Sequence, residues 1–377
     1  MKRRIMYVSG TRADFGLLEG TLQRIHRSPL LSLQIVATGM HLSPVYGLTV
    51  REIEAAGLSI CARVPVDVET TDGAAMARAI GAEIIAFAGI LGRERPDLLI
   101  VLGDRGEMLA GAIAALHLNI PVVHLHGGER SGTVDEPVRH AISKLVHFHF
   151  VATNGSRDRL IRMGERPDCI FVTGAPGLDD TQTAPNRSRF ALAEAQGLDP
   201  DRPIALVVYH PVVQSADTAA SEAQTVIEAV LSAGLQALCL SPNSDAGGSA
   251  IREVIASKAG QGAIRVGTHF SRTTFLAWMK AADVLVGNSS SGIIEAASFG
   301  LPVVNVGERQ QGRERNANTC DVEVDAEAVK SAVLGAIKHG RYPPANVYGD
   351  GHAGERIVEL LERLPIEPSI LRKTNAY

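Results

Sequence analysis

The sequence has few cysteines and no large excess of charge of either sign. Its 377 residues include four cysteines, Cys61, Cys169, Cys239 and Cys320, and no two of them stand at a metal-ligand or redox spacing. A reducing cytosol therefore fits best. The formal net charge of −4, from 37 basic and 41 acidic residues, gives no support for a surface that binds nucleic acid or membranes.

Targeting signals and long apolar runs are also missing. The start, MKRRIMYVSG, has only four apolar residues before Ser9, which is too short for the apolar core of a signal peptide. No apolar run approaches the roughly 18 residues that a membrane span needs, and there is no low-complexity tract or short repeat. We therefore expect a cytoplasmic protein with neither a membrane nor a nucleic-acid partner.

Short apolar runs alternate with segments of helical periodicity along the whole chain. The first half predicts strands over 5–9, 31–38, 98–102, 120–125, 148–152 and 169–173, and helices over 14–25, 76–91, 109–118 and 156–163. The second half predicts strands over 204–209, 236–240, 263–266, 284–286 and 302–306, and helices over 221–233, 251–259 and 274–279. Asn154 or Ser156 is expected to cap the helix over 156–163.

This alternation is typical of an α/β fold with parallel sheets. Apolar periodicity is lost after Asp180, so we place a domain boundary there. The sequence predicts two Rossmann-like, doubly wound domains, 1–180 and 181–350, that face each other across a cleft. Ligands of such sheets bind beyond the carboxyl ends of the strands.

Ionisable residues gather where the strands over 98–102 and 120–125 end. They are Asp104, Arg105, Glu107, His126, Glu129, Arg130, Asp135, Glu136, Arg139 and His140. So many charged groups at a predicted ligand edge indicate a reaction centre. The alternative is a solvated loop that caps a helix, and the pattern alone leaves it open.

A metal site is the main rival for this segment. His124 and His126 point the same way if both belong to a strand, and Asp104, Glu129 and Asp135 are near in sequence. Against zinc or manganese, there is no HxxxE pair, and the neighbouring arginines would repel a cation. We therefore predict no metal and no cofactor.

A second group of residues is suited to phosphate. Arg12 lies at a strand-to-helix turn, where an anion is stabilised. GNSSSGIIEA, from Gly287 to Ala296, offers serine hydroxyls and amides at another such turn, and Glu295 can accept from ribose hydroxyls. The next loop carries Arg309, Arg313 and Arg315, whose forked guanidinium groups suit a diphosphate. His210, after a strand, can donate to the phosphates or be structural.

Taken together in order, these motifs resemble one family. GTRAD, GDR, HGGE with SGT and RHAISKLVHFH, GNSSSG with IIE, RQ with GRE, and YGDG resemble the hydrolysing UDP-N-acetylglucosamine 2-epimerases of sialic-acid synthesis. The resemblance spans the chain from GTRAD to YGDG. It implies the GT-B-like architecture of nucleotide-sugar glycosyltransferases, with the sugar at the first domain and UDP at the second. It also implies that a C-terminal segment, 351–377, returns to the first domain through a helix over 355–364, and that the enzyme is a homodimer or a dimer of dimers without a catalytic metal.

The resemblance also assigns residues to roles. It implies catalysis by Asp104, His126, Asp135, Arg139 and His210. It implies UDP and sugar binding by Arg12, Arg105, His124, Glu129, Asn243, Asp245, Ser289, Ser290, Gly292, Glu295 and Arg309. We expect the arginines to keep one of Asp104 and Asp135 ionised, as a base, and burial to raise the pKa of the other, as an acid.

The reaction implied is elimination of UDP from UDP-N-acetylglucosamine to a glycal, followed by hydration to N-acetylmannosamine. Some relatives carry glutamate where this chain has His126, which favours a different sugar as an alternative, UDP-N,N'-diacetylbacillosamine of legionaminic-acid synthesis. Two other classes stay open. One is a GT-B-like glycosyltransferase that passes the sugar to an acceptor, and the other is a non-catalytic nucleotide-sugar sensor.

Overall fold

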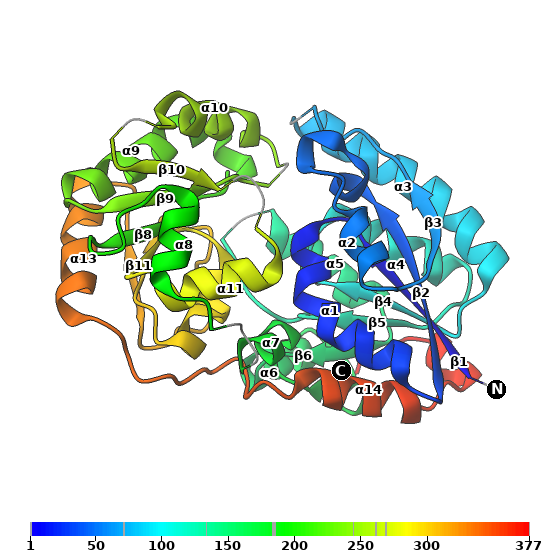
Figure 1. The fold of residues 1–377 in the computed structure, drawn as a ribbon. Coiled ribbons are helices and arrows are strands. Elements are labelled where there is room, and N and C mark those ends of the chain that lie inside the picture. Colours follow the sequence, from blue (N-terminus) through cyan, green and yellow to red (C-terminus); the bar gives the residue numbers. More distant parts are fainter. Residues whose placement is uncertain are drawn as a thin grey trace. The chain divides into compact units, whose positions relative to one another are not determined.

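The chain folds into two compact α/β units. The computed structural model describes residues 2–70, 72–132, 134–182, 186–243, 245–260, 262–267 and 270–376. The first unit comprises Met1–Glu129, Val134–Asp180 and Tyr348–Tyr377, and the second comprises Arg130–Thr133 and Thr181–Val347. Figure 1 traces the elements of each unit in sequence colours. The short segment Arg130–Thr133 belongs to the second unit, although the sequence suggested that it lies within the first domain.

The first unit is built on a parallel sheet of seven strands. Its strands are β1 (Arg3–Ser9), β2 (Leu31–Thr38), β3 (Ile60–Val64), β4 (Leu98–Leu102), β5 (Val122–Leu125), β6 (Phe148–Val151) and β7 (Ile170–Val172). Their order is β3-β2-β1-β4-β5-β6-β7, so the direction of winding reverses between β1 and β4. A reversal of this kind leaves an open position at the carboxyl ends of the two strands, where ligands bind.

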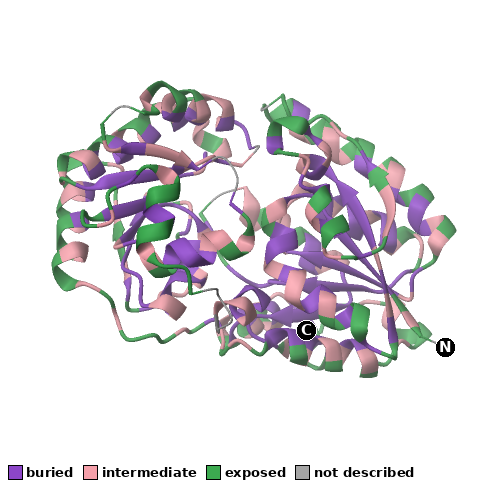
Figure 2. Cartoon of the chain, in the orientation of Figure 1, coloured by how far each residue is buried: buried purple, intermediate pink, exposed green. Residues whose placement is uncertain are grey.

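Helices cover both faces of this sheet because its strands are apolar on both faces. Ile5 and Tyr7 of β1 belong to one core cluster, with α1 (Arg12–Arg27), α2 (Val50–Ala55) and α14 (Ala353–Arg363). Met6 and Val8 belong to the other, with α3 (Gly73–Glu94), α4 (Gly106–His117) and α5 (Asp135–Leu145). Of two further short helices, α6 (Asn154–Arg162) lies in this unit and α7 (Asp179–Gln182) spans its boundary at Asp180. Figure 2 shows the strands as buried and the outer sides of the helices as exposed.

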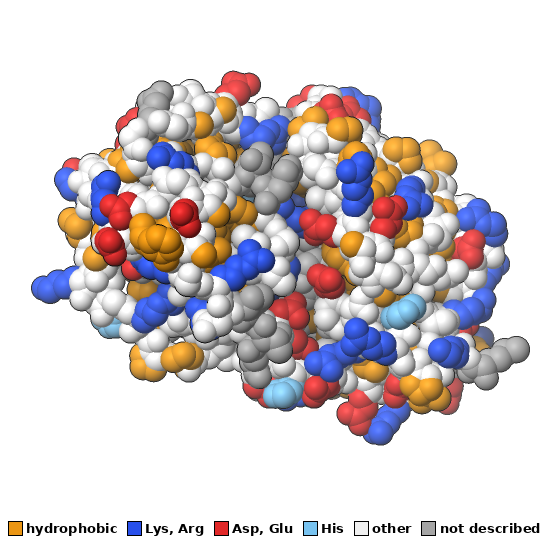
Figure 3. All heavy atoms as spheres, viewed as in Figure 1, with side chains coloured by type: hydrophobic (Ala, Val, Ile, Leu, Met, Phe, Trp, Pro, Cys, Tyr) orange, Lys and Arg blue, Asp and Glu red, His pale blue; other side chains and the backbone are white. Residues whose placement is uncertain are grey.

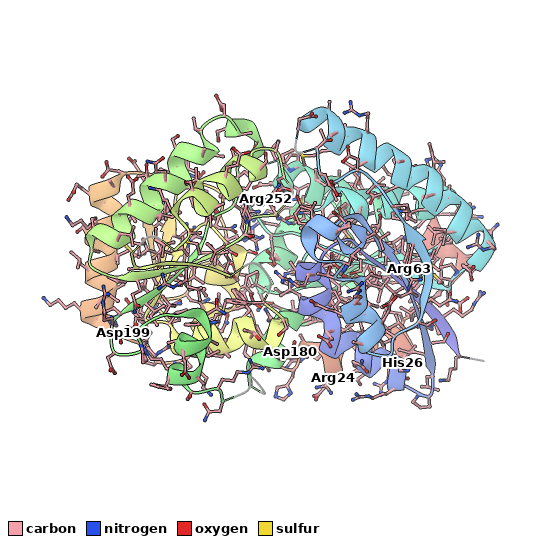
Figure 4. All side chains as sticks on the ribbon, turned by 45° about the horizontal axis from the view of Figure 1, so that its top comes forward. Arg24, His26, Arg63, Asp180, Asp199 and Arg252 are labelled. Carbon is pink, nitrogen blue, oxygen red and sulfur yellow. The ribbon has the colours of Figure 1, made fainter. Side chains whose placement is uncertain are left out.

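The helix α14 packs on the first unit, as the resemblance implied. Its Ile357 and Leu361 are fully buried and share a core cluster with Ile25 of α1. At the surface, Arg24, labelled in Figure 4 near the end of α1, pairs with Glu355 of α14 at 3.4 Å. The chain therefore returns to its first unit after it has formed the second.

The second unit is built on a parallel sheet of six strands. They are β8 (Ile204–Val208), β9 (Gln236–Leu240), β10 (Ile264–Gly267), β11 (Val284–Gly287), β12 (Val303–Val306) and β13 (Thr319–Val322), in the order β10-β9-β8-β11-β12-β13. One face is covered by α9 (Ala219–Ser232), α10 (Gly248–Lys258) and α13 (Ala326–His339). The other is covered by α8 (Arg189–Gln196) and α11 (Arg272–Ala281), and α12 (Ser290–Ile294) follows β11. The prediction of two doubly wound parallel α/β domains is confirmed.

Several elements were not predicted, among them α2, α5, α8, α13, β3 and β13, and the cap of α6 needs correction. The helix α5 was not predicted, because its first turn is charged and contains Pro137; proline is tolerated there, since that amide has no partner within the helix. The strand β3 was missed because it is a partly exposed edge strand. The helix α6 is capped by Thr153, whose hydroxyl accepts from the amide of Ser156 at 3.1 Å, and not by Asn154 or Ser156.

The helix α3 also differs from the expectation that no membrane-length apolar run exists. By length and composition alone, its 22 residues are enough to cross a membrane. Its four isoleucines, with Phe87, Leu91 and Met76, account for most of this apolar character. Phe87, Ile90 and Leu91 pack on the sheet, and the buried Glu83 accepts from the hydroxyl of Thr38 at 2.7 Å. On the face drawn in Figure 3, acidic and basic side chains are interspersed over both units.

Candidate functional site

In the first unit, the candidate residues follow the ends of three neighbouring strands. Arg12 comes after β1, Asp104 after β4 and His126 directly after β5. Because all strands of the sheet are parallel, these three strand ends meet at one edge. The topology therefore brings together residues that are far apart in the sequence.

A buried carboxylate fixes the turn that leads from β1 into α1. Asp14 accepts from the hydroxyls of Tyr7 at 2.9 Å and Ser9 at 2.5 Å, and from the amides of Gly10 at 3.0 Å and Thr11 at 2.6 Å. The Asp14 carboxylate thus satisfies the orphan donors at the start of the helix. The turn has a defined conformation, and Arg12 is the first helical residue after it.

Arg12 has a buried nitrogen that lacks a partner. Its Nη1 atom makes no hydrogen bond to any residue that the structure describes. Burial lowers the pKa of this guanidinium, which the negative charge of Glu52 partly offsets. A buried unpaired donor is costly unless a ligand satisfies it, so this arrangement suits an anion.

Asp104 is paired with a buried arginine. Arg139 of α5 is 1% exposed, and its Nη2 atom forms an ion pair with Asp104. Its Nη1 atom donates to the carbonyl oxygen of Glu129 at 3.2 Å. An adjacent guanidinium stabilises the charged form of a carboxylate, so Asp104 is fixed in place and ionised.

His126 adopts an unusual backbone conformation and is held by a buried carboxylate. Its φ of +62° lies in the left-handed region, which a residue with a side chain rarely adopts. Its Nδ1 atom lies 2.5 Å from Oε1 of Glu129, which is 1% exposed. In the neutral ring the proton then resides on Nδ1, and Nε2 is an acceptor. Glu129 therefore positions the histidine, in place of the predicted contact with substrate.

His124 does not reach the edge of the sheet. It is fully buried, with Nδ1 3.1 Å from the hydroxyl of Ser143 and Nε2 2.7 Å from the carbonyl oxygen of Gly103. Burial lowers its pKa to about 3. The predicted sugar contact is therefore wrong, because both ring nitrogens are occupied. The premise that His124 and His126 point the same way fails as well, since the strand ends at Leu125.

Two further predicted residues of this unit lie at the starts of helices. Asp135 is the first residue of α5 and is only partly buried. Arg105 precedes α4, and its Nε atom lies 2.9 Å from Glu107. Its guanidinium is thus held by a carboxylate in the first turn of α4.

In the second unit, Asn288 joins the ends of β8 and β11. Its side-chain oxygen accepts from the amide of His210 at 2.7 Å, and its side-chain nitrogen donates to the carbonyl of His210 at 2.8 Å. Gly287 has a φ of +140°, and a Cβ atom there would lie 2.1 Å from the carbonyl oxygen of Val208, so only glycine fits. Sequence reasoning missed Asn288, although its place directly after β11 was a usable signal.

The neutral side chain of His210 can donate a hydrogen bond from its Nε2 atom. Its Nδ1 atom accepts from the amide of Asn243 at 3.2 Å, so the neutral ring carries its proton on Nε2. The side chain of Asn243 donates to Asp245 at 2.5 Å, and Asp245 is buried. The three predicted residues His210, Asn243 and Asp245 therefore do lie together.

The turn formed by Ser289, Ser290 and Ser291, here called the serine turn, is capped as expected, but the helix that follows it is short. Ser289 caps α12, which has only five residues, and its hydroxyl lies 2.8 Å from that of Ser291. Ser290 is partly buried. A Cβ atom at Gly292 would lie 3.0 Å from Val303, so this glycine serves the packing of α12 on the sheet.

Glu295 has a partner that the sequence did not reveal. It is 3% exposed and forms an ion pair with Arg272 of α11. The pair fixes its carboxylate beside the serine turn. A contact between Glu295 and a ribose therefore competes with this ion pair.

The arginine loop after β12 lines a pocket. Arg309 donates to the carbonyl of Asn288 at 3.2 Å, which places it beside the serine turn. Arg315 is bound to Asp321 at 3.0 Å and so holds the loop. A pocket of about 860 Å³ is lined by Gly132, Tyr209, Glu222, Asn288, Arg309, Arg313, Arg315 and Glu323, among others. Of the residues to which the resemblance assigned UDP and sugar binding, only Arg309 lines it.

The side chains at the strand ends do not form a metal centre. Among the residues that the structure describes, no group of three or more histidines, cysteines and acidic residues could hold a metal ion. The buried clusters of this part of the chain are ion pairs and hydrogen-bonded histidines instead.

Comparisons with known proteins agree with this architecture. The family described as UDP-N-acetylglucosamine 2-epimerase matches residues 23–362. The chain is 52% identical over 377 residues, all of both chains, to a protein of Legionella pneumophila named UDP-N,N'-diacetylbacillosamine 2-epimerase (hydrolyzing). It is 31% identical over 363 residues, 95% of both chains, to a UDP-N-acetylglucosamine 2-epimerase of Neisseria meningitidis.

The fold also resembles a solved structure. The crystal structure of UDP-GlcNAc 2-epimerase from Neisseria meningitidis bound to UDP-GlcNAc superposes with a TM-score of 0.79 at 16% identity. The superposition covers 95% of this chain and 99% of that one. At this identity the likeness establishes the fold.

The buried neutral His124 leads to a testable pH dependence. A histidine with a pKa of about 3 in the folded chain and about 6.5 when unfolded stabilises the fold above pH 6.5. This contribution falls by about 1.4 kcal/mol for each pH unit below 6.5. The free energy of unfolding would be measured with urea at pH 6.5 and at pH 4.5. We expect its decrease between these two pH values to be about 2–3 kcal/mol smaller in His124→Asn than in the parent. Equal losses in parent and variant would contradict the assignment; His352→Asn, at an exposed histidine, should behave as the parent.

Proposed function

This chain is a hydrolysing nucleotide-sugar 2-epimerase of the UDP-N-acetylglucosamine 2-epimerase family, and we propose that its substrate is UDP-N,N'-diacetylbacillosamine. The observation that supports this substrate is the 52% identity, over the full length of both chains, to a relative that carries that name. The relative named for UDP-N-acetylglucosamine shares 31%. The order of the two substrates favoured by the sequence alone is therefore reversed.

The reaction needs a base and an acid at carbon 2 of the sugar. The base removes the proton from carbon 2 while the bond between carbon 1 and the diphosphate oxygen breaks, which gives a glycal and UDP. A proton then returns to carbon 2 from the other face, and water adds its hydroxide to carbon 1. The products are UDP and a free sugar that is inverted at carbon 2.

The first unit supplies groups for these proton transfers. We assign Asp104 as the base, because its ion pair with Arg139 favours the ionised carboxylate. We assign His126 as the acid, because Glu129 orients its ring and balances the charge of the imidazolium, whose Nε2–H is then the proton donor. Asp135, partly exposed at the start of α5, is the group we assign to activate water.

The second unit supplies groups for the nucleotide. Diphosphate is a good leaving group when donors and cations stabilise its charge. The Nε2–H of His210 and the guanidinium of Arg309 are such donors, and both are tied to Asn288. The hydroxyls of Ser289 and Ser290 follow at the same turn. On the first unit, the buried Nη1 atom of Arg12 lacks a partner among the described residues and by itself suits an anion.

Proton NMR in deuterated water tests the reaction and the substrate together. Incubation with UDP-N,N'-diacetylbacillosamine and no acceptor should release UDP and a free 2-epimeric sugar with deuterium at carbon 2. We expect kcat/KM for this donor to exceed that for UDP-N-acetylglucosamine by at least about tenfold, since the two differ in polar groups that a specific site distinguishes. A preference for UDP-N-acetylglucosamine would overturn the substrate, and turnover only with an acceptor sugar would indicate a glycosyltransferase.

Two aspartates that flank β4, Asp97 before it and Asp104 after it, provide a test variant and a control for this assay. Asp104→Asn should lower turnover by roughly 10²–10⁴ while the affinity for UDP stays unchanged. Asp97, at the start of the same strand, pairs with Arg4 at the surface. Asp97→Asn should therefore retain the parent rate, and an equal loss in both variants would remove Asp104 from the mechanism.

We also propose that the protein acts as a homodimer. The outer face of α3 is apolar, with Gly81, Ala82, Ala88 and Gly89 exposed and Ile85 78% exposed. Such a face favours association, and a charge at its centre opposes it. Light scattering should give twice the chain mass of 40.0 kDa for the parent and one chain for Ile85→Lys. Leu30→Lys, at an exposed apolar residue elsewhere in the same unit, should remain dimeric; a monomeric parent would contradict the proposal.

A further inference from the structure

The C-terminal tail carries a lysine that is buried in the first unit. Lys373 lies ten residues after the end of α14 at Arg363, and its side chain is 18% exposed. Its ammonium nitrogen lies 2.8 Å from the carbonyl oxygen of Ser143, 2.6 Å from that of Val146 and 2.6 Å from Oε2 of Glu165. An ammonium group has three N–H donors, and these three acceptors use all of them.

Two of these acceptors belong to the end of α5. The carbonyl groups of the last turn of a helix have no partner within the helix. A lysine there can bind them, and its positive charge also interacts favourably with the negative end of the helix dipole. Ser143 lies in the last turn of α5, and Val146 is its C-cap. The tail therefore supplies the cap of a helix that is more than 200 positions away in the sequence.

The third acceptor anchors the lysine. Glu165 is 2% exposed and is also bound by Lys144 at 2.7 Å and by His149 at 3.0 Å. Burial raises the pKa of this carboxyl, but the hydrogen bonds from His149, Lys144 and Lys373 outweigh burial and lower the pKa to about 2. The amide of Ala376 donates to the carbonyl of Gly164 at 2.9 Å, so the tail is held on both sides of this cluster.

The capped helix is the one that carries the candidate catalytic groups. Asp135 is the first residue of α5, and Arg139, in its middle, forms the ion pair with Asp104. Ser143 also contacts His124, whose other nitrogen lies 2.7 Å from the carbonyl oxygen of Gly103, next to Asp104. Contacts of α5 thus reach Asp104 through Arg139 and its neighbour Gly103 through His124.

We propose that Lys373 is a positioning residue for the reaction: by capping α5 and pairing with Glu165, the C-terminal tail fixes the helix that orients Arg139 and Asp135 toward the reacting sugar. This inference rests on the proposed function, since it assumes that these residues act on the substrate. It assigns a role in turnover to a segment that carries none of the residues assigned to the sugar or to UDP.

The substitution Lys373→Met in the full-length chain tests the inference. It keeps the length of the side chain and removes its donors and its charge. A displacement of about 1 Å at a reacting group can cost about a hundredfold in rate, so we expect kcat to fall by about ten- to a hundredfold, with KM and the affinity for UDP within about twofold of the parent. Lys373→Arg, which keeps the charge and donors but not their geometry, should recover part of this loss.

His149→Asn is the matched control. His149 of β6 binds the same carboxylate at 3.0 Å but belongs neither to α5 nor to the tail, whereas Lys144 lies in the last turn of α5 and also donates to Asn375 of the tail. Both variants should lose stability, but only Lys373→Met should lose kcat and show faster hydrogen exchange in the last turn of α5. Parent-like kcat and exchange in Lys373→Met, or equal losses of kcat in both variants, would overturn the inference. If the parent itself does not turn over the nucleotide sugar, the proposed function fails, and the exchange data still test the cap.

Discussion

The ion pair between Asp104 and the buried Arg139 is the interaction on which the first unit depends. Arg139 is 1% exposed, so its charge has left water and must be compensated inside the fold. Removal of one partner from such a pair typically costs about 3–5 kcal/mol, because it leaves a buried charge unpaired. The strand β4, the helix α5 and the turn after β5, where Glu129 accepts from Arg139, are therefore held in one arrangement.

Most of the fold could be predicted because parallel strands leave a strong signal. The strands Leu98–Leu102 and Gln236–Leu240 have the predicted bounds, since both are short apolar runs that end in a turn. The helix α5 could not be predicted because tertiary contacts stabilise it: the buried Arg139 and the cap from Lys373 come from distant parts of the chain. A window of sequence around Pro137 contains neither signal.

The sequence indicated where the candidate residues lie but not which side chains they contact. The residues that follow strand ends, such as Asp104, His126 and His210, do lie at the carboxyl edges of their sheets. Their roles depend on contacts that no spacing reveals, namely Glu129 on His126, Arg272 on Glu295, and Asn288 between His210 and Arg309. The sugar contact of His124 came from the resemblance alone, and the premise that His124 and His126 point the same way failed because the strand ends at Leu125 and His126 has a positive φ.

A double-mutant cycle between Asp104 and Arg139 tests most directly whether this ion pair acts as one unit in the reaction. Asp104→Asn, Arg139→Gln and the double variant would be compared by kcat/KM for the diacetylated donor, with UDP affinity as the check of folding. If the two residues work as a unit, the double variant should be about as impaired as the worse single variant. Losses that multiply would show that Asp104 and Arg139 act independently, which would contradict the central role of the ion pair in turnover.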